Sequence, residues 1–166
     1  QVRNLPVVVS GTKLGVDGVL GVGFLSHTQA TVDHRRGRIV LRPSASRMRE
    51  GEAWPLSFAG DRTLLAPARI DGIDTFVIVN PTARGMRFVP SQAMLFEKSR
   101  RFPKSPALER VEAGSMALKV ETQDSKTFPE GLDVAYGFMI GGMLGADGFR
   151  NRTVTFDFRA MRITVE

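Results

Sequence analysis

"DGVLGVGFLSHTQATVDHRRGRIVLRP", residues 17–43, returns at the end of the chain as "GGMLGADGFRNRTVTFDFRAMRITVE", residues 141–166. The two stretches align without a gap, and each closes on a strand, a turn and a second strand. A shared pattern of this length indicates duplication rather than chance, so the sequence predicts two related lobes that end in the same unit. The matches include Gly18 with Gly142, Leu20-Gly21 with Leu144-Gly145, Thr31 with Thr155, Asp33 with Asp157, Arg35 with Arg159, and Arg38-Ile39 with Arg162-Ile163.

Strand signals dominate the chain. Short segments that are β-branched or alternating, and bounded by Gly, Pro or Asp, predict strands. They cover 5–10, 29–33, 38–42, 56–58, 63–70, 75–79, 116–121 and 153–158. Asp71-Gly72 predicts a hairpin turn between two of them. Helical signal is limited to residues 90–97, where Ser91 could cap, and to a turn at Phe24-Leu25. We therefore expect a mainly β protein with short helices.

The amino-acid composition limits the classes of protein to which this chain can belong. With 166 residues, 42% hydrophobic and 24% charged, the chain can bury one good core but not two full-sized domains. It has no cysteine, which excludes disulfides, thiolate metal sites and thiol nucleophiles. His27 and His34 lie seven residues apart without a carboxylate cluster, so we predict no metal and no cofactor.

The compartment stays open on the sequence. Absence of cysteine fits either side of a bacterial inner membrane, and we favour a periplasmic or secreted location. No apolar run approaches the roughly 20 residues that a membrane helix needs, so no membrane span is predicted.

Charge suggests a further class of partner. The net charge is +6, and the densest basic run is residues 98–104. No Arg-rich helix or ribonucleoprotein motif accompanies this run, so we interpret it as a solvated loop. A basic nucleic-acid-binding β-domain would need aromatics interleaved on one sheet face, and the chain has a single Trp54 and a single Tyr136. It is a remote alternative, and no nucleic-acid partner is predicted.

The order of elements in the second half resembles a known family, the retropepsin-like (pepsin-fold) aspartic peptidases of bacteria. In that family each lobe has a hairpin whose second strand ends in Asp-Thr/Ser-Gly-Ala, then a helix, a flap hairpin, and a hydrophobic-hydrophobic-Gly strand beside the Asp loop. This chain follows the order with a hairpin at 69–79, Asn80-Pro81-Thr82-Ala83, Phe88-Val89-Pro90 and Met143-Leu144-Gly145.

The resemblance implies an architecture. We expect an acid-protease-like lobe, a closed or partly open β-barrel with short helices, together with the terminal strands of a preceding homologous lobe. Residues 1–43 would be the C-terminal part of the first lobe, 44–50 a linker, and 51–166 a complete but degenerate lobe.

The departure from the family lies at the position of catalysis. Aspartic peptidases work because two carboxylates about 3 Å apart share one proton. Asn80 stands where one carboxylate should be, and an amide can hydrogen-bond a water but cannot activate it. Pro81 replaces a Thr or Ser and removes a backbone donor, and Thr82 replaces a glycine. No catalytic residue is intact, and we predict that the chain does not cleave peptides.

The other carboxylates have structural interpretations. By the resemblance, Asp147 follows the Leu-Gly turn and caps a short helix, while Asp33 and Asp157 begin the last turn of each repeat. Asp17 was the remaining candidate, and it too is interpreted as structural.

The resemblance also implies a peptide groove. Asn80 and Thr82 should lie beside Leu144-Gly145, with Ala83 in the groove wall and residues 112–133 as a flap. Met116 and Leu118 are the groove and flap contacts it suggests, although their alternation with Val120 favours a buried core.

Two functional hypotheses follow. The first is the non-catalytic part of a peptidase whose active Asp loop lies upstream, with a peptide or protein ligand and either a homodimer or a missing N-terminal lobe as partner. The second is a non-enzymatic peptide-binding or scaffold module, in which extended peptides add to the edge of the flap by strand pairing.

Overall fold

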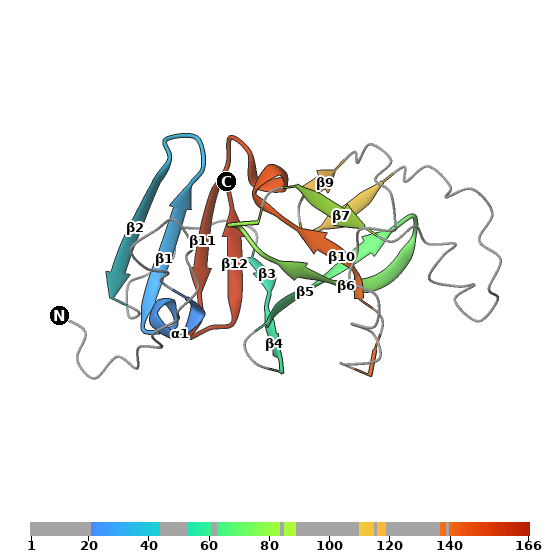
Figure 1. Cartoon of the computed structure of the whole chain (residues 1–166), viewed down its shortest axis with the longest axis horizontal. Helices are drawn as coiled ribbons and strands as arrows, with labels where there is room; N and C mark the ends of the chain where they lie inside the picture. Colours follow the sequence, from blue (N-terminus) through green and yellow to red (C-terminus); the bar gives the residue numbers. More distant parts are fainter. Residues whose placement is uncertain are drawn as a thin grey trace, which may run out of the picture.

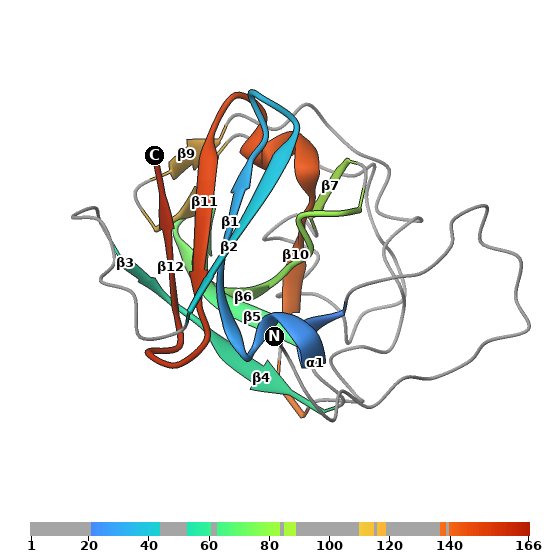
Figure 2. The ribbon, with the colours of Figure 1, turned by 90° about the vertical axis from the view of Figure 1, so that its left-hand side faces the viewer.

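The computed structural model describes residues 21–43, 53–60, 63–83, 85–88, 110–114, 116–118, 137–138 and 140–166. These residues form two β-sheets with a one-turn helix and a 3₁₀ turn, so the predicted mainly β class is confirmed. Figure 1 shows the first sheet on one side of the molecule and the second sheet on the other. Figure 2 shows the strands of the second sheet crossing behind those of the first.

The first sheet is antiparallel throughout and has the order β2-β1-β11-β12-β3. It joins segments from both ends of the chain, because the N-terminal hairpin β1–β2 lies directly beside the C-terminal hairpin β11–β12 (Figure 1). Its strands are β1 (Thr28–Asp33), β2 (Arg38–Pro43), β3 (Ala53–Pro55), β11 (Thr153–Asp157) and β12 (Arg162–Val165).

The second sheet has the order β7-β10-β6-β5-β8-β9, with β4 paired to β5 off this path. Its strands are β4 (Ser57–Ala59), β5 (Thr63–Ile70), β6 (Ile73–Val79), β7 (Met86–Phe88), β8 (Val111–Ala113), β9 (Met116–Leu118) and β10 (Ile140–Leu144). β10 lies between β6 and β7, parallel to the first and antiparallel to the second. Two strands that are consecutive in sequence are therefore separated by one from the end of the chain.

The described residues do not form a closed barrel. The path of the second sheet ends at β7 on one side and at β9 on the other, and these two strands do not pair with each other in the described residues. Both are three residues long, which leaves few backbone groups for closing a barrel. The expectation was a closed or partly open barrel; among the described residues the sheet does not close, and the acid-protease-like lobe stays a prediction.

The two repeat units have the same local structure at a constant offset. α1 (Val22–Leu25) follows Gly21, and the 3₁₀ turn η2 (Ala146–Phe149) follows Gly145, both glycines being extended. Each hairpin turn is held by its first aspartate, because Asp33 Oδ1 accepts from the Arg36 N–H at 3.0 Å and Asp157 Oδ1 accepts from the Ala160 N–H at 3.0 Å. The predicted role of these two aspartates in the last turn of each repeat is confirmed.

Matched turns also share a strained backbone position. Gly37 in the first turn has φ +61°, and the equivalent residue of the second turn, Met161, has φ +48°. Only glycine adopts this region without a steric cost, so the turn geometry imposes an unfavourable backbone conformation on Met161.

The main core lies where the second sheet packs on the β11–β12–β3 part of the first. Trp54 anchors it, with 4% of its surface exposed and its indole N–H donating to the Pro67 carbonyl at 2.6 Å. β6 buries alternate residues from Thr75 to Val79, and β5 does so from Ala66 to Ile70, as a strand with one covered face does. Fully buried members include Ile70, Val77, Val111, Leu144, Phe149, Val154 and Ile163.

Most predicted elements within the described residues are found. The strand predicted at 63–70 is β5 to the residue, and the Asp71-Gly72 turn is the two-residue hairpin with positive φ at both positions. The turn at Phe24-Leu25 is part of α1. The strand at 5–10, the helix at 90–97 and the linker at 44–50 lie outside the described residues. β3 and β8 were not predicted.

Candidate functional site

The site suggested by the sequence is the loop that leaves β6. Leu144 of β10 pairs with Val79, the last residue of β6, and the Leu144 carbonyl accepts a hydrogen bond from the Asn80 N–H at 3.0 Å. The Ala83 carbonyl then accepts from the Ala146 N–H at 2.7 Å. The structure thus brings Asn80 and Ala83 against Leu144 and the residue after Gly145, as the expected order of elements requires.

The side chain of Asn80 is used within its own loop. Its Oδ1 accepts from the Thr82 hydroxyl at 2.8 Å, from the Thr82 N–H at 3.3 Å and from the Ala83 N–H at 3.2 Å. The Asn80 carbonyl accepts a further bond from the Ala83 N–H at 3.1 Å, which closes a β-turn with Pro81 at its second position. Asn followed by Pro is a favoured opening for such a turn, so these residues serve to hold the corner.

Gly145 permits the close approach of this loop to β10. A Cβ on Gly145 would overlap the Gly85 carbonyl oxygen and would lie 2.6 Å from that of Ala83. Any larger residue would therefore push the 80–85 loop away. In the first repeat unit the equivalent Gly21 has nothing within 4 Å of its Cβ position. The repeated Leu-Gly pair is therefore packed against a loop at Gly145, whereas at Gly21 the described residues show no such contact.

Asp147 ties the loop to η2. Its Oδ2 accepts from the Gly85 N–H at 2.7 Å, and its Oδ1 accepts from an Arg150 guanidinium N–H at 3.0 Å. It was expected to cap the short helix, but the N-cap residue of η2 is Gly145 and no side chain caps it. The prediction of a cap was wrong, because the carboxylate turns to the free backbone N–H of the neighbouring loop.

The residues suggested for the groove and the flap differ in how deeply they are buried. Ala83 is half-buried, whereas Leu144 is fully buried and Met116 is 1% exposed within the main core. Met116 therefore presents almost no side-chain surface for a ligand to contact. Leu118 is placed only by its backbone, opposite Val111. Most of the expected flap, 112–133, lies outside the described residues.

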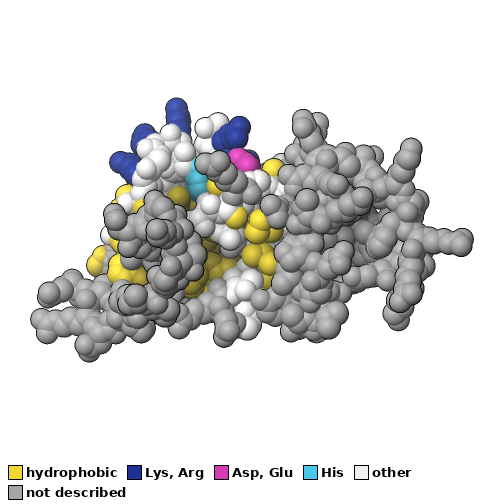
Figure 3. Space-filling view, viewed as in Figure 1, with side chains coloured by type: hydrophobic (Ala, Val, Ile, Leu, Met, Phe, Trp, Pro, Cys, Tyr) yellow, Lys and Arg dark blue, Asp and Glu magenta, His cyan; other side chains and the backbone are white. Residues whose placement is uncertain are grey.

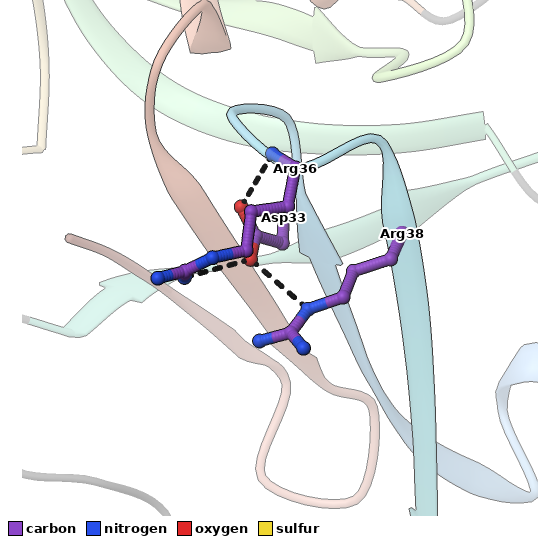
Figure 4. Close-up of polar contacts among 3 residues, drawn as sticks. All are labelled: Asp33, Arg36 and Arg38. Atoms are coloured by element: carbon purple, nitrogen blue, oxygen red, sulfur yellow. Dashed lines mark hydrogen bonds and ion pairs between the residues drawn. The ribbon is translucent and has the colours of Figure 1, made fainter.

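The turn between β1 and β2 holds a polar cluster that the sequence did not single out. Figure 4 shows Asp33 facing Arg36 and Arg38. Its Oδ2 lies 3.2 Å from the Arg36 Nη1 and 3.2 Å from the Arg38 Nε. Burial by itself would raise the pKa of Asp33, but the Arg36 N–H and the two guanidiniums outweigh it, and the pKa is lowered. The repeated Asp and Arg of both units were the available signal for this cluster.

His34 links this turn to the end of the loop site. Its ring stacks on Phe149 of η2 with centroids 5.8 Å apart, and its backbone N–H donates to the Arg152 carbonyl at 3.0 Å. Its Nε2 is buried without a hydrogen-bond partner among the described residues. Burial lowers the pKa of His34, and the charge of Asp33 opposes this only in part. At His34 the sequence served only to exclude a metal site, and it indicated no stacked residue.

The chemistry available at the loop is limited. Among the described residues, Asp147 is the carboxylate that hydrogen-bonds this loop, and both of its oxygens are engaged. Within the described ranges, no group of three or more His, Cys, Asp or Glu side chains is placed to hold a metal ion. None of the described helices has the length and apolar content to cross a membrane.

Comparisons of the chain with family models, with curated proteins and with solved structures found no significant match.

Proposed function

We propose that this chain is a degenerate, non-catalytic lobe of a retropepsin-like aspartic peptidase, preceded by the closing strands of a homologous lobe. The observation that carries the proposal is the contact of the Asn80-Pro81-Thr82 loop with Leu144, which Gly145 permits because it has no side chain. The family resemblance implies this relationship between the Asp loop and the hydrophobic-hydrophobic-Gly strand.

Asn80 gives this lobe no part in acid or base catalysis. Its amide oxygen accepts three hydrogen bonds from its own loop, so it is not free to orient a water molecule. An amide also cannot share a proton with a second carboxylate. The role of the lobe is to stabilise a partner lobe that carries an intact Asp loop, upstream in the same polypeptide or in a second chain.

The experiment is a peptidase assay on the purified chain. We expect no pepstatin-sensitive cleavage of a mixed fluorogenic peptide library between pH 3 and 7. Asn80→Ala tests the loop, and Asp147→Asn is the matched control because it removes the carboxylate that reaches the same loop. A rate in the wild-type chain that either substitution abolishes would overturn the proposal.

A non-enzymatic peptide-binding module is the second candidate. The observation that favours it is the outer edge of β2, which none of the described strands pairs with, since such an edge can accept an added strand. Retention of uncleaved extended peptides on the immobilised chain would support this candidate over the first. Nucleic-acid binding stays a remote alternative, and salt-sensitive retention on a nucleic-acid column would support it.

A further inference from the structure

Equivalent isoleucines in the two repeat units have opposite exposures. Ile163 in β12 is fully buried, while Ile39 at the same position of β2 is 63% exposed. Both lie on one face of the first sheet, because the cross-strand rows run Ile39–Val32–Val154 and Leu41–Ala30–Phe156–Ile163. The same residue in the same local structure is therefore covered in one unit and open in the other.

Ile163 is buried in the main core, where the second sheet packs on this part of the first sheet, and its neighbour on the far side of β12 is β3. This strand pairs antiparallel with β12 and sets Trp54 directly opposite Ile163. No strand of the described residues pairs with the outer edge of β2, which is the outermost strand of the sheet in Figure 1. The β3–β12 pair is thus an internal template for what β2 lacks.

The open face continues beyond one residue. Leu41 is 40% exposed, and it follows Ile39 on the same side of β2. An edge strand that presents two adjacent large apolar side chains invites pairing with another strand.

Charge decides between the possible occupants. Arg38 and Arg42 flank the apolar pair and are both exposed, and the Arg38 Nε also lies 3.2 Å from the Asp33 carboxylate. In Figure 3, positively charged side chains also gather at the end of the molecule that holds the β1–β2 turn. Antiparallel pairing of two copies centred on Val40 would set Arg38 of each against Arg42 of the other, which is unfavourable. A strand with acidic residues at its flanks suits this edge better than a second copy.

We propose that β2 is a docking site for a partner polypeptide that adds one antiparallel strand, with acidic flanks and an aromatic side chain opposite Ile39. This inference rests on the internal repeat; it does not depend on the proposed peptidase lobe, and it deepens the second candidate, the peptide-binding module. Main-chain hydrogen bonds along β2 would supply affinity, and the aromatic contact with Ile39 and Leu41 would supply specificity.

The test uses the full chain and a peptide that copies residues 50–61, EGEAWPLSFAGD, which carries the β3 strand with three acidic residues. Titration into the isotope-labelled chain, followed by amide chemical shifts, should give saturable changes along β2 below about 1 mM. Ile39→Lys, at an exposed position that folding does not need, should weaken binding about tenfold or more. Replacing the peptide's tryptophan by alanine should have an effect of similar size.

Three results would overturn the proposal. One is the absence of saturable shifts on β2 up to about 2 mM peptide. A second is binding that Ile39→Lys leaves unchanged while the variant keeps the wild-type melting temperature. The third is a dimer in sedimentation experiments that Ile39→Lys dissociates, because the occupant of the edge would then be a second copy.

Discussion

The hydroxyl groups of Thr31 and Thr155 meet at 3.0 Å across the centre of the first sheet. These threonines occupy the same position in the two repeat units, and they are also directly opposite each other in the antiparallel pairing of β1 with β11. The register therefore places a local two-fold axis between them. It relates β1–β2 to β11–β12, and it explains why the two hairpin turns lie at opposite ends of the sheet in Figure 1.

Replacing either threonine by valine should reveal this pairing. Thr31→Val or Thr155→Val leaves one hydroxyl without its partner in a poorly solvated position, at a cost of about 1 kcal/mol each. The double variant should cost less than the sum, with a coupling of about 0.5 kcal/mol or more in urea denaturation. Thr164→Val is the control, because the Thr164 hydroxyl is buried without a partner in the described residues and its loss should be neutral or stabilising. Additive single effects would contradict the pairing.

The two repeat glycines offer a second matched comparison. Gly145→Ala puts a Cβ onto backbone oxygens that cannot rotate away, so it should destabilise the chain by about 3 kcal/mol or prevent folding. Gly21→Ala has open space and an extended backbone, and should change the free energy of unfolding by less than about 0.5 kcal/mol. Thermal and urea unfolding of the two variants measures the difference. Equal effects would show that the 80–85 loop is not seated on Gly145 in solution.

The sequence predicted elements where the pattern is local and failed where tertiary contacts decide. β5 and β6 were predicted from alternation and the Asp-Gly turn between them. β10 contains Gly141 and Gly142, which weaken a strand by propensity, yet a Cβ at Gly141 would lie 2.6 Å from the Thr75 side chain. Only packing beside β6 makes it a strand, and it was expected from the family resemblance rather than from its own residues.

The candidate site shows the same division. The adjacency of Asn80 to Leu144 followed from the order of elements, whereas the internal use of the Asn80 side chain depends on loop geometry that no spacing encodes. β3 and β8 are three residues long and offer no period to detect, so their strand character comes from β12 and β5. The alternation favoured a buried core over a groove contact for Met116, and Met116 is buried.

Asp33 should make the stability of the fold depend on pH in the acidic range. Its pKa is lowered in the folded state, so its contribution is present above the unfolded value of 3.8 and is lost as the pH falls through the folded pKa. Asp33→Asn should lower the melting temperature at pH 7 and should converge with the wild type below about pH 3. Asp157→Asn is the matched control with a smaller expected loss, since the Arg162 Nε lies 3.8 Å from Asp157. A constant difference across pH would reject the assignment.

His34 should act in a separate pH window. Burial lowers its pKa, so the unfolded chain takes up a proton near pH 6.5 while the folded chain does not. Stability should therefore fall as the pH drops through 6.5 and should level off below the folded pKa. His34→Phe keeps the stack on Phe149 without a titrating group and should flatten this limb in melting experiments. The exposed His27, changed to Asn, is the control; a limb that survives in His34→Phe would assign it elsewhere.

Asn80 should prove structural rather than chemical. Asn80→Ala removes the acceptor of three hydrogen bonds, and we expect a loss of about 1 kcal/mol because the loop is partly solvated. Asn80→Asp keeps the acceptor and strengthens it with charge, so at pH 7 it should restore stability to at least the wild-type level. It should still not cleave peptides, because one carboxylate cannot form a proton-sharing pair. Urea denaturation and the peptidase assay check both points together, and cleavage by Asn80→Asp as a monomer would show that a second carboxylate faces the loop.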